Sequence, residues 1–241
     1  RTEAQVAYTF TVKLDVIDAF IREKRREGKR ITFFQVIIAA FLKVIGERPS
    51  LNRFVAGRRL YQHHEFDILY VVKPRLSDDS NESVARVSFE EDDTIYDVSE
   101  KMTAQTQAIQ NQVEMKDDDK LIRQVLRLPR WLLRAVFATY RWLDFHGIAP
   151  RKMIEVIPFY STIFVSHLGT VGADSAIHHL YEMGTCSIFC VIGKQRDIPE
   201  RDDDGGVTWT KGIDLSMTLD ERICDGYYFV KSLRLMERYL R

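Results

Sequence analysis

The segment from Phe33 to Ile45 is apolar on nearly every side of a helix, and it is the strongest constraint on the fold. A helix of this kind has no polar face to turn toward water, so it has to be buried. Thr32 and Gln35 have the spacing of a capping box at its start, and Gly46 and Pro49 mark its end. The rest of the chain must therefore cover this helix with other secondary structure.

Strand-like and helical segments are mixed along the rest of the 241 residues. Alternating apolar side chains predict strands at residues 8–14, 59–62, 66–73, 83–89, 162–166, 187–192 and 207–218. Helices are predicted at residues 15–27, 94–112 and 227–239, and the acidic segment 201–206 is predicted as a hairpin connection. Because there is no internal repeat and no clean domain boundary, we predict one α/β (α+β layered) domain over residues 1–241.

The composition of the chain narrows the classes of function. Hydrophobic residues make up 45%, enough for a sizeable core, and Lys+Arg and Asp+Glu both number 35, which removes the usual electrostatic case for a nucleic-acid partner. The three cysteines suggest no disulfide framework and favour a reducing, cytoplasmic setting. No apolar run reaches the ~18 residues of a membrane span, and the sequence predicts no metal site. The basic run from Arg22 to Arg30 is predicted as the solvated face of a helix, with a phosphate or CoA patch as the alternative.

Two short motifs in the second half of the chain carry chemical information. Residues 163–169 read Ile-Phe-Val-Ser-His-Leu-Gly, and residues 220–226 read Asp-Glu-Arg-Ile-Cys-Asp-Gly just before the final predicted helix. They resemble the Phe-Thr-Ile-Ser-Asn-Leu-Gly strand and the His-x-x-x-Asp-Gly motif of the catalytic domain of 2-oxoacid dehydrogenase (dihydrolipoamide) acyltransferases, which are relatives of chloramphenicol acetyltransferase. The order and spacing of the motifs also fit. The resemblance covers most of the chain except about residues 116–160, which we predict to be a helical insertion.

The resemblance implies a chloramphenicol acetyltransferase-like mixed sheet flanked by helices. It also implies CoA-dependent transfer of an acyl group from a small-molecule thioester to a thiol or other acceptor, in a homotrimer whose serine and base come from different subunits. By this resemblance Ser166 is the oxyanion donor, Glu221 stands at the position of the catalytic base, and Asp225 and Gly226 hold the backbone of the site. No lipoyl domain and no lipoyl attachment site is visible in this chain.

Glu221 replaces the histidine that acts as the base in the family. A free glutamate has a pKa of about 4.3 and a thiol one of about 8.5, so an unperturbed carboxylate is a poor base here, although burial makes a carboxylate more basic. Three interpretations stay open: an acyltransferase that uses Glu221, one that uses another histidine, and a non-catalytic oligomeric scaffold that keeps the fold. His178 and His179 are the candidates for another histidine. We also assign them, with His167, Gly169 and Gly226, to the substrate-binding site.

The stretch from Leu121 to Ile148 is rich in aromatic residues interleaved with arginines. Pro129 and Pro150 bracket its richest part, and it is too short and too charged to span a membrane. Three interpretations stay open for it: helices that pack on the domain, a lid over an acyl pocket, or a surface at residues 130–147 for a membrane or a protein partner.

Overall fold

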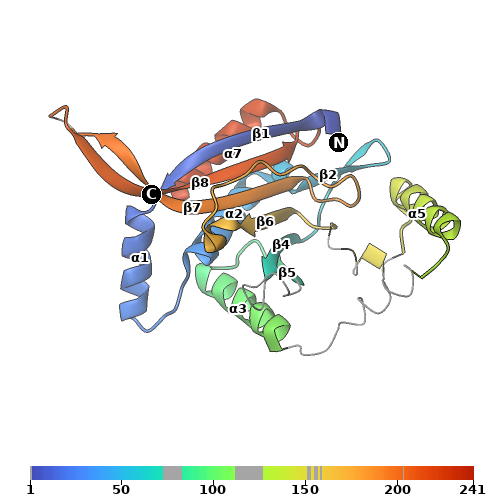
Figure 1. Ribbon diagram of the computed structural model, residues 1–241, viewed down its shortest axis with the longest axis horizontal. Helices are drawn as coiled ribbons and strands as arrows, with labels where there is room; N and C mark the ends of the chain where they lie inside the picture. Colours follow the sequence, from blue (N-terminus) through green and yellow to red (C-terminus); the bar gives the residue numbers. More distant parts are fainter. Residues whose placement is uncertain are drawn as a thin grey trace.

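A mixed six-stranded sheet forms the centre of the protein (Figure 1). The computed structural model describes residues 2–72, 83–111, 127–150, 153–154, 157, 159–202 and 204–241. The strands of the sheet are β1 (Gln5–Lys13), β4 (Phe66–Val72), β5 (Ser83–Phe89), β6 (Ile163–His167), β7 (Ile188–Arg201) and β8 (Val207–Asp220), in the order β1-β8-β7-β6-β4-β5. The strands β4, β6 and β7 run parallel to one another, and the other neighbouring pairs are antiparallel. The predicted α/β fold class with a mixed sheet is confirmed.

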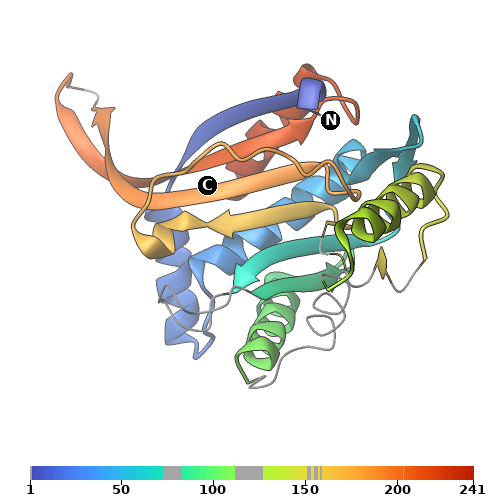
Figure 2. The same ribbon diagram turned by 45° about the vertical axis from the view of Figure 1, so that its right-hand side comes forward.

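Helices cover one face of this sheet (Figure 2). Within this layer α2 (Phe33–Glu47) contacts α1 (Asp15–Arg26), α3 (Ile95–Asn111) and α7 (Gly226–Tyr239). The main hydrophobic core fills the space between the helices and the sheet, and α2 contributes to it from Ile37 through Ile45. The prediction that this helix is buried is confirmed, and so is the capping box formed by Thr32 and Gln35.

The other face of the sheet is partly covered by the chain between β6 and β7 (Figure 2). This connection begins with a short 3-10 helix, Leu168–Val171, and continues without regular secondary structure to β7. Its Leu180 and Cys186 pack against the sheet in a second, smaller apolar cluster, which is completed by Leu69, Phe164, Phe189 and Val191. The sheet therefore has a helix-covered face and a loop-covered face.

Two parts of the fold differ from the sequence prediction. The strand predicted at 187–192 is too short, because after a β-bulge between Ile192 and Gln195 β7 pairs with β8 again as far as Arg201. A strand that the pattern did not predict, β2 (Arg53–Ala56), pairs with β3 (Arg59–Gln62) in a hairpin. The first part of the predicted insertion, residues 116–126, lies outside the described residues, and its later part forms α5 (Arg130–Phe145).

The second half of β7, residues 196–201, and the first half of β8, residues 207–212, form a two-stranded arm that projects from the sheet (Figure 1). Two apolar residues of the arm, Val207 and Trp209, are 63% and 66% exposed. At its base the Arg196 guanidinium donates to both oxygens of Asp214 at 2.9 Å and holds the pKa of that carboxyl below its ordinary value. Because a two-stranded ribbon is marginally stable alone in water, the arm would gain stability from contact with another chain.

Gln35 provides a test of what holds the helical layer together. Its Oε1 accepts from the Thr32 N–H at 2.9 Å, and its Nε2 donates to the Ser99 carbonyl at 3.3 Å and to Thr103 Oγ1 at 3.2 Å. Gln35→Leu leaves these groups without their partner, so we expect the free energy of unfolding to fall by about 1–3 kcal/mol in urea denaturation. Thr32→Ser keeps the hydroxyl that caps α2 and should change this free energy by only a few tenths of a kcal/mol. Equal stability of the Gln35→Leu variant and the wild type would contradict the assignment.

Candidate functional site

Ser166 lies at the carboxyl end of β6, on the loop-covered face of the sheet. Alternation along the strand places the Ser166 side chain on the same side as Phe164, a member of the smaller apolar cluster. Ser166 also pairs with Val191 on β7, which belongs to the same cluster. The side chain is half-buried, and among the described residues its hydroxyl makes no hydrogen bond. The Ser166 hydroxyl is therefore available to a bound molecule.

Glu221 and Asp225 lie in the turn between β8 and α7. Glu221 is exposed, and its backbone N–H donates to the Ala4 carbonyl at 2.8 Å. Asp225 caps α7, since its carboxylate accepts from the Tyr228 N–H at 2.7 Å. A Cβ atom on Gly226 would meet nothing within 4 Å, so packing within this chain does not require that glycine. Asp225 thus has a structural contact, and Glu221 is free to face another molecule.

Asp220 and Arg222 fix the shape of the turn that carries Glu221. Asp220 is fully buried, and Arg222 donates Nε to one of its oxygens at 2.8 Å and Nη2 to the other at 2.6 Å. This paired hydrogen bonding raises the pKa of Arg222 above its ordinary value. The Asp220 N–H also donates to the Ser187 carbonyl at 3.0 Å, which ties the turn to the start of β7.

Ser166 and Glu221 of one chain lie at opposite ends of the sheet. Ser166 pairs with Val191, and Val191 pairs with Ser216 on β8. Glu221 lies just past the end of β8, five residues after Ser216. Ser166 and Glu221 are therefore separated by roughly 16 Å along the strand direction and by about two strand spacings across the sheet. Side chains cannot bridge such a separation, so a single chain does not bring these two predicted site residues together.

The structure instead places His178 on the same face as Ser166. The His178 ring stacks on Phe189 with ring centres 4.0 Å apart, and Phe189 precedes the Ser166 partner Val191 by two residues on β7. His179 stacks on His178 in turn, with centres 4.7 Å apart. All three side chains are among the described residues, and no hydrogen bond joins either imidazole to Ser166.

His167 and Gly169 have packing roles beside Ser166. His167 points to the helix-covered face, where its ring lies 6.4 Å from the ring of Phe33 and 5.8 Å from that of Phe34, centre to centre. Burial lowers the pKa of His167. A Cβ atom on Gly169 would come within 2.4 Å of the Gly193 carbonyl oxygen, so the turn that follows Ser166 requires a glycine there. Both residues therefore fix the end of β6.

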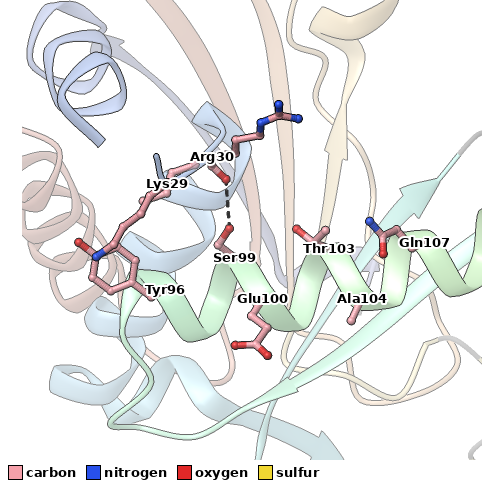
Figure 3. A pocket seen from close by; sticks show the side chains of 9 residues that line it. Lys29, Arg30, Tyr96, Ser99, Glu100, Thr103, Ala104 and Gln107 are labelled. Atoms are coloured by element: carbon pink, nitrogen blue, oxygen red, sulfur yellow. Dashed lines mark hydrogen bonds between the residues drawn. The ribbon is translucent and has the colours of Figure 1, made fainter. Parts of the chain in front are cut away.

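An open groove of about 690 Å³ lies between α3 and the loop that precedes α2 (Figure 3). Ser99, Thr103 and Gln107 project from one side of α3, and Glu100 projects from the other (Figure 3). The groove is completed by Lys29, Arg30, Ile31, Tyr96 and Ala104. The Lys29 ammonium lies 3.7 Å from the centre of the Tyr96 ring, and the Ser99 hydroxyl donates to the Arg30 carbonyl at 3.5 Å.

This groove lies at the same end of the sheet as Ser166. Arg30 precedes Phe33 by three residues, and the Phe33 ring contacts His167, the residue after Ser166. Lys29 and Arg30 bring two cations to this groove against the one carboxylate of Glu100, so its described lining has a net positive charge that suits an anionic ligand. The sequence prediction favoured a solvated helix face for the basic run. The four-residue spacing of Ser99, Thr103 and Gln107 is the signal that could have indicated a polar groove wall.

The fold was compared with those of known proteins. The sequence matches no protein-family model and, at a significant level, no curated protein. A probable dihydrolipoamide acetyltransferase from Listeria monocytogenes superposes with a TM-score of 0.66 and 15% identity, covering 98% of this chain and 83% of that one. The dihydrolipoamide acetyltransferase of Azotobacter vinelandii gives a TM-score of 0.66 at 13% identity, with coverages of 98% and 81%. A chloramphenicol acetyltransferase gives 0.55 at 13%, with coverages of 99% and 89%.

This protein has the chloramphenicol acetyltransferase fold. The fold resemblance inferred from the two motifs is thereby confirmed. In this fold the serine motif ends strand β6, and the Asp220–Gly226 motif joins β8 to α7. Among the described residues, no group of three or more His, Cys, Asp and Glu side chains is arranged to hold a metal ion.

The half-buried imidazole of His167, the residue after Ser166, gives a pH-dependent prediction. Because burial lowers the pKa of His167 in the folded state, the unfolded chain takes up its proton more readily, with a pKa of about 6.5. The free energy of unfolding should therefore decrease as the pH falls below about 6.5 toward the folded-state pKa. His167→Phe keeps a ring against Phe33 and Phe34 and should reduce this decrease, measured by urea denaturation at several pH values. His64→Gln, a substitution at an exposed histidine, is the control and should retain the decrease in stability. A pH profile of His167→Phe that equals that of the wild type would refute the prediction.

Proposed function

We propose that this chain is the catalytic unit of an oligomeric, CoA-dependent acyltransferase, with each site built from two copies. The observation that carries the proposal is the placement of the two motifs at opposite ends of one sheet. Ser166 offers an uncommitted hydroxyl at one end, and Glu221 is exposed at the other. A second copy can present its Glu221 end to the Ser166 end of the first, which one chain alone cannot do.

The solved structures with this fold support the proposal. In the Azotobacter vinelandii enzyme, the roles of a serine, a histidine and an asparagine in the catalytic mechanism have been investigated, and that histidine and asparagine are four positions apart. Glu221 and Asp225 have the same separation. Another structure with this fold is the cubic core of the pyruvate dehydrogenase multienzyme complex. We propose a homotrimer for this chain, in which the exposed arm at residues 196–212 contacts a neighbouring copy.

The proposed reaction is exchange of an acyl group between two sulfur atoms or from sulfur to another acceptor. A base removes the proton of the acceptor thiol, and the thiolate attacks the thioester carbonyl carbon to form a new C–S bond. Ser166 donates a hydrogen bond to the oxyanion of the tetrahedral intermediate. When that intermediate collapses, the C–S bond to CoA breaks, and the CoA thiolate takes the proton back from the base.

Glu221 is our candidate for that base, contributed by the neighbouring copy. A carboxylate becomes a competent base for a thiol only when it is withdrawn from water, and a second copy closing over the exposed turn would provide this. The alternative base is His178, since it lies on the face of Ser166 in the same chain. The exposure of Glu221 also favours a second candidate function, a non-catalytic oligomeric scaffold with this fold.

Thioester exchange between acetyl-CoA and dihydrolipoamide tests the proposal. Ser166→Ala should lower kcat by about 10²–10³-fold and Glu221→Ala by about 10²–10⁴-fold. If the site is shared, oligomers reassembled from a mixture of these two inactive variants should regain part of the activity, because some sites then hold both intact residues. Glu221→His should raise kcat above that of the wild type, since its pKa lies closer to that of a thiol.

The controls for this experiment separate the three interpretations. His178→Gln should keep the wild-type rate if Glu221 is the base, and a loss of activity there with a fully active Glu221→Ala variant would move the base to the imidazole. Absence of exchange in the wild type and in Glu221→His, with no CoA binding by calorimetry, would leave only the scaffold. Sedimentation of the wild type gives the oligomeric state in the same preparations.

The groove between α3 and the preceding loop is our candidate site for the anionic part of CoA. Lys29 and Arg30 would contact phosphate oxygens there, while the thioester extends toward Ser166 at the same end of the sheet. Lys29→Ala combined with Arg30→Ala should raise KM for acetyl-CoA on the order of tenfold and leave kcat nearly unchanged, because these contacts exist in both ground and transition states. Lys231→Ala is the matched control, because Lys231 lies over the Tyr227 ring on α7, outside the groove, and KM should not change. A decrease in kcat with KM unchanged would contradict this placement.

A further inference from the structure

Helix α5 is anchored to the protein through one of its sides. Tyr140 is buried, and its hydroxyl lies 2.5 Å from that of Tyr160, which donates to Asp144 at 2.5 Å. Burial and the neighbouring carboxylate raise the pKa of Tyr160, so this hydroxyl stays protonated as a donor. The β2–β3 turn is also close, since a Cβ atom on Gly57 would come within 2.3 Å of the Phe145 carbonyl oxygen. The helix therefore has a fixed orientation.

The outward side of α5 carries a second apolar stripe. At about 3.6 residues per turn, five residues share this side: Trp131, Ala135, Ala138, Trp142 and Phe145. The side chains of Trp131 and Trp142 are 71% and 56% exposed, and Phe145 is 47% exposed. Ile148, just after the helix, is 58% exposed. Two tryptophans three turns apart, with alanines between them, form an aromatic surface that is largely exposed, and the His146 ring packs against its Trp142 end with ring centres 4.3 Å apart.

An arginine stripe runs beside these aromatic residues. Arg130, Arg134 and Arg141 lie along one side of the same helix, with one turn between the first two and about two turns between the last two. All three are exposed, and none forms an ion pair with a described residue. The only acidic residue of the helix, Asp144, is turned inward to Tyr160. The outward side thus combines positive charge with large aromatic side chains and contains no carboxylate.

We propose that this face of α5 binds the surface of an anionic lipid bilayer. Indole rings suit the boundary between headgroups and acyl chains, and arginines beside them attract negatively charged headgroups. In the part of the chain that the structure describes, no helix has the length and apolar character needed to cross a bilayer. The helix would therefore lie in the plane of the membrane surface. This inference is independent of the proposed acyltransferase activity, because it uses none of the residues of the candidate site.

Two other occupants fit the face less well. A second copy packed on it would bring two arginine stripes together, with no free carboxylate on either helix to offset their charge. A lid over the groove of Figure 3 would have to reach α3, whereas α5 is held by Tyr160 and the β2–β3 turn instead. An acidic protein partner would satisfy the arginines, and the experiment distinguishes this case by using lipid vesicles alone.

The tryptophans provide the readout. The chain has three, Trp131, Trp142 and Trp209, so a Trp209→Phe protein carries indole fluorescence on α5 alone. Its emission should shift to shorter wavelength and become protected from acrylamide on addition of phosphatidylcholine–phosphatidylglycerol vesicles, but not with phosphatidylcholine vesicles. Co-sedimentation with the mixed vesicles should weaken as the salt concentration rises.

Two triple variants with the same change in charge, one on α5 and one on α1, test whether the arginines of α5 bind the vesicles. Replacing Arg130, Arg134 and Arg141 with Gln should weaken partitioning into mixed vesicles on the order of a hundredfold, since each arginine near an anionic surface contributes a similar electrostatic term. The control carries the same charge change on α1, at the exposed Arg22, Arg25 and Arg26, and should bind as the parent protein does. Equal loss in both variants, or no binding to mixed vesicles at all, would overturn the proposal. So would an emission shift that depends on protein concentration without vesicles, because it would identify a second copy as the occupant.

Discussion

The hydrogen bonds of Gln35 connect the start of the buried helix α2 to helix α3. The buried Gln35 amide accepts a hydrogen bond from the Thr32 N–H at the start of α2, and it donates to the Ser99 carbonyl and to Thr103 Oγ1 on α3. The same contacts fix the two rings that follow the cap, Phe33 and Phe34, against His167 at the end of β6. The position of Ser166 and the shape of the groove on α3 therefore depend on the start of one helix. Burial of α2 in the core is what makes that start rigid.

Strand direction decides which residues can meet. Strands β6 and β7 are parallel, and β8 is antiparallel to both. The carboxyl end of β6 and the carboxyl end of β8 therefore lie at opposite ends of the strands in the sheet. A serine at one end and a base position at the other cannot act on one substrate within a chain. The strand order by itself therefore keeps residues 166 and 221 of one chain apart, whatever their side chains.

Local patterns predicted the fold well, because they report on local structure. The capping box at Thr32, the alternating strands and the final helix follow from side-chain periodicity, and all are present. The second half of β7 was not predicted because residues 194–197 are charged or polar and exposed on both sides, so the strand there has no buried side to produce alternation. The stacking of His178 on Phe189 and the separation of Ser166 from Glu221 depend on strand order, which periodicity along the chain does not contain.

In the motif that joins β8 to α7, the residues that hold the turn in shape differ from the residue that we propose as the base. Asp220 and Arg222 form a buried-to-surface ion pair, and Asp225 caps α7, so these three positions hold the turn whether or not the protein turns over a substrate. Glu221 is exposed and contributes only its backbone N–H to the fold, so the structure tolerates almost any side chain there. The contacts of Asp220, Arg222 and Asp225 consequently account for the fold of this turn, whereas the side chain of Glu221 bears only on the proton transfer that we propose. In our proposal, a carboxylate in place of an imidazole leaves the scaffold intact, and activity depends on whether a neighbouring copy withdraws that carboxylate from water.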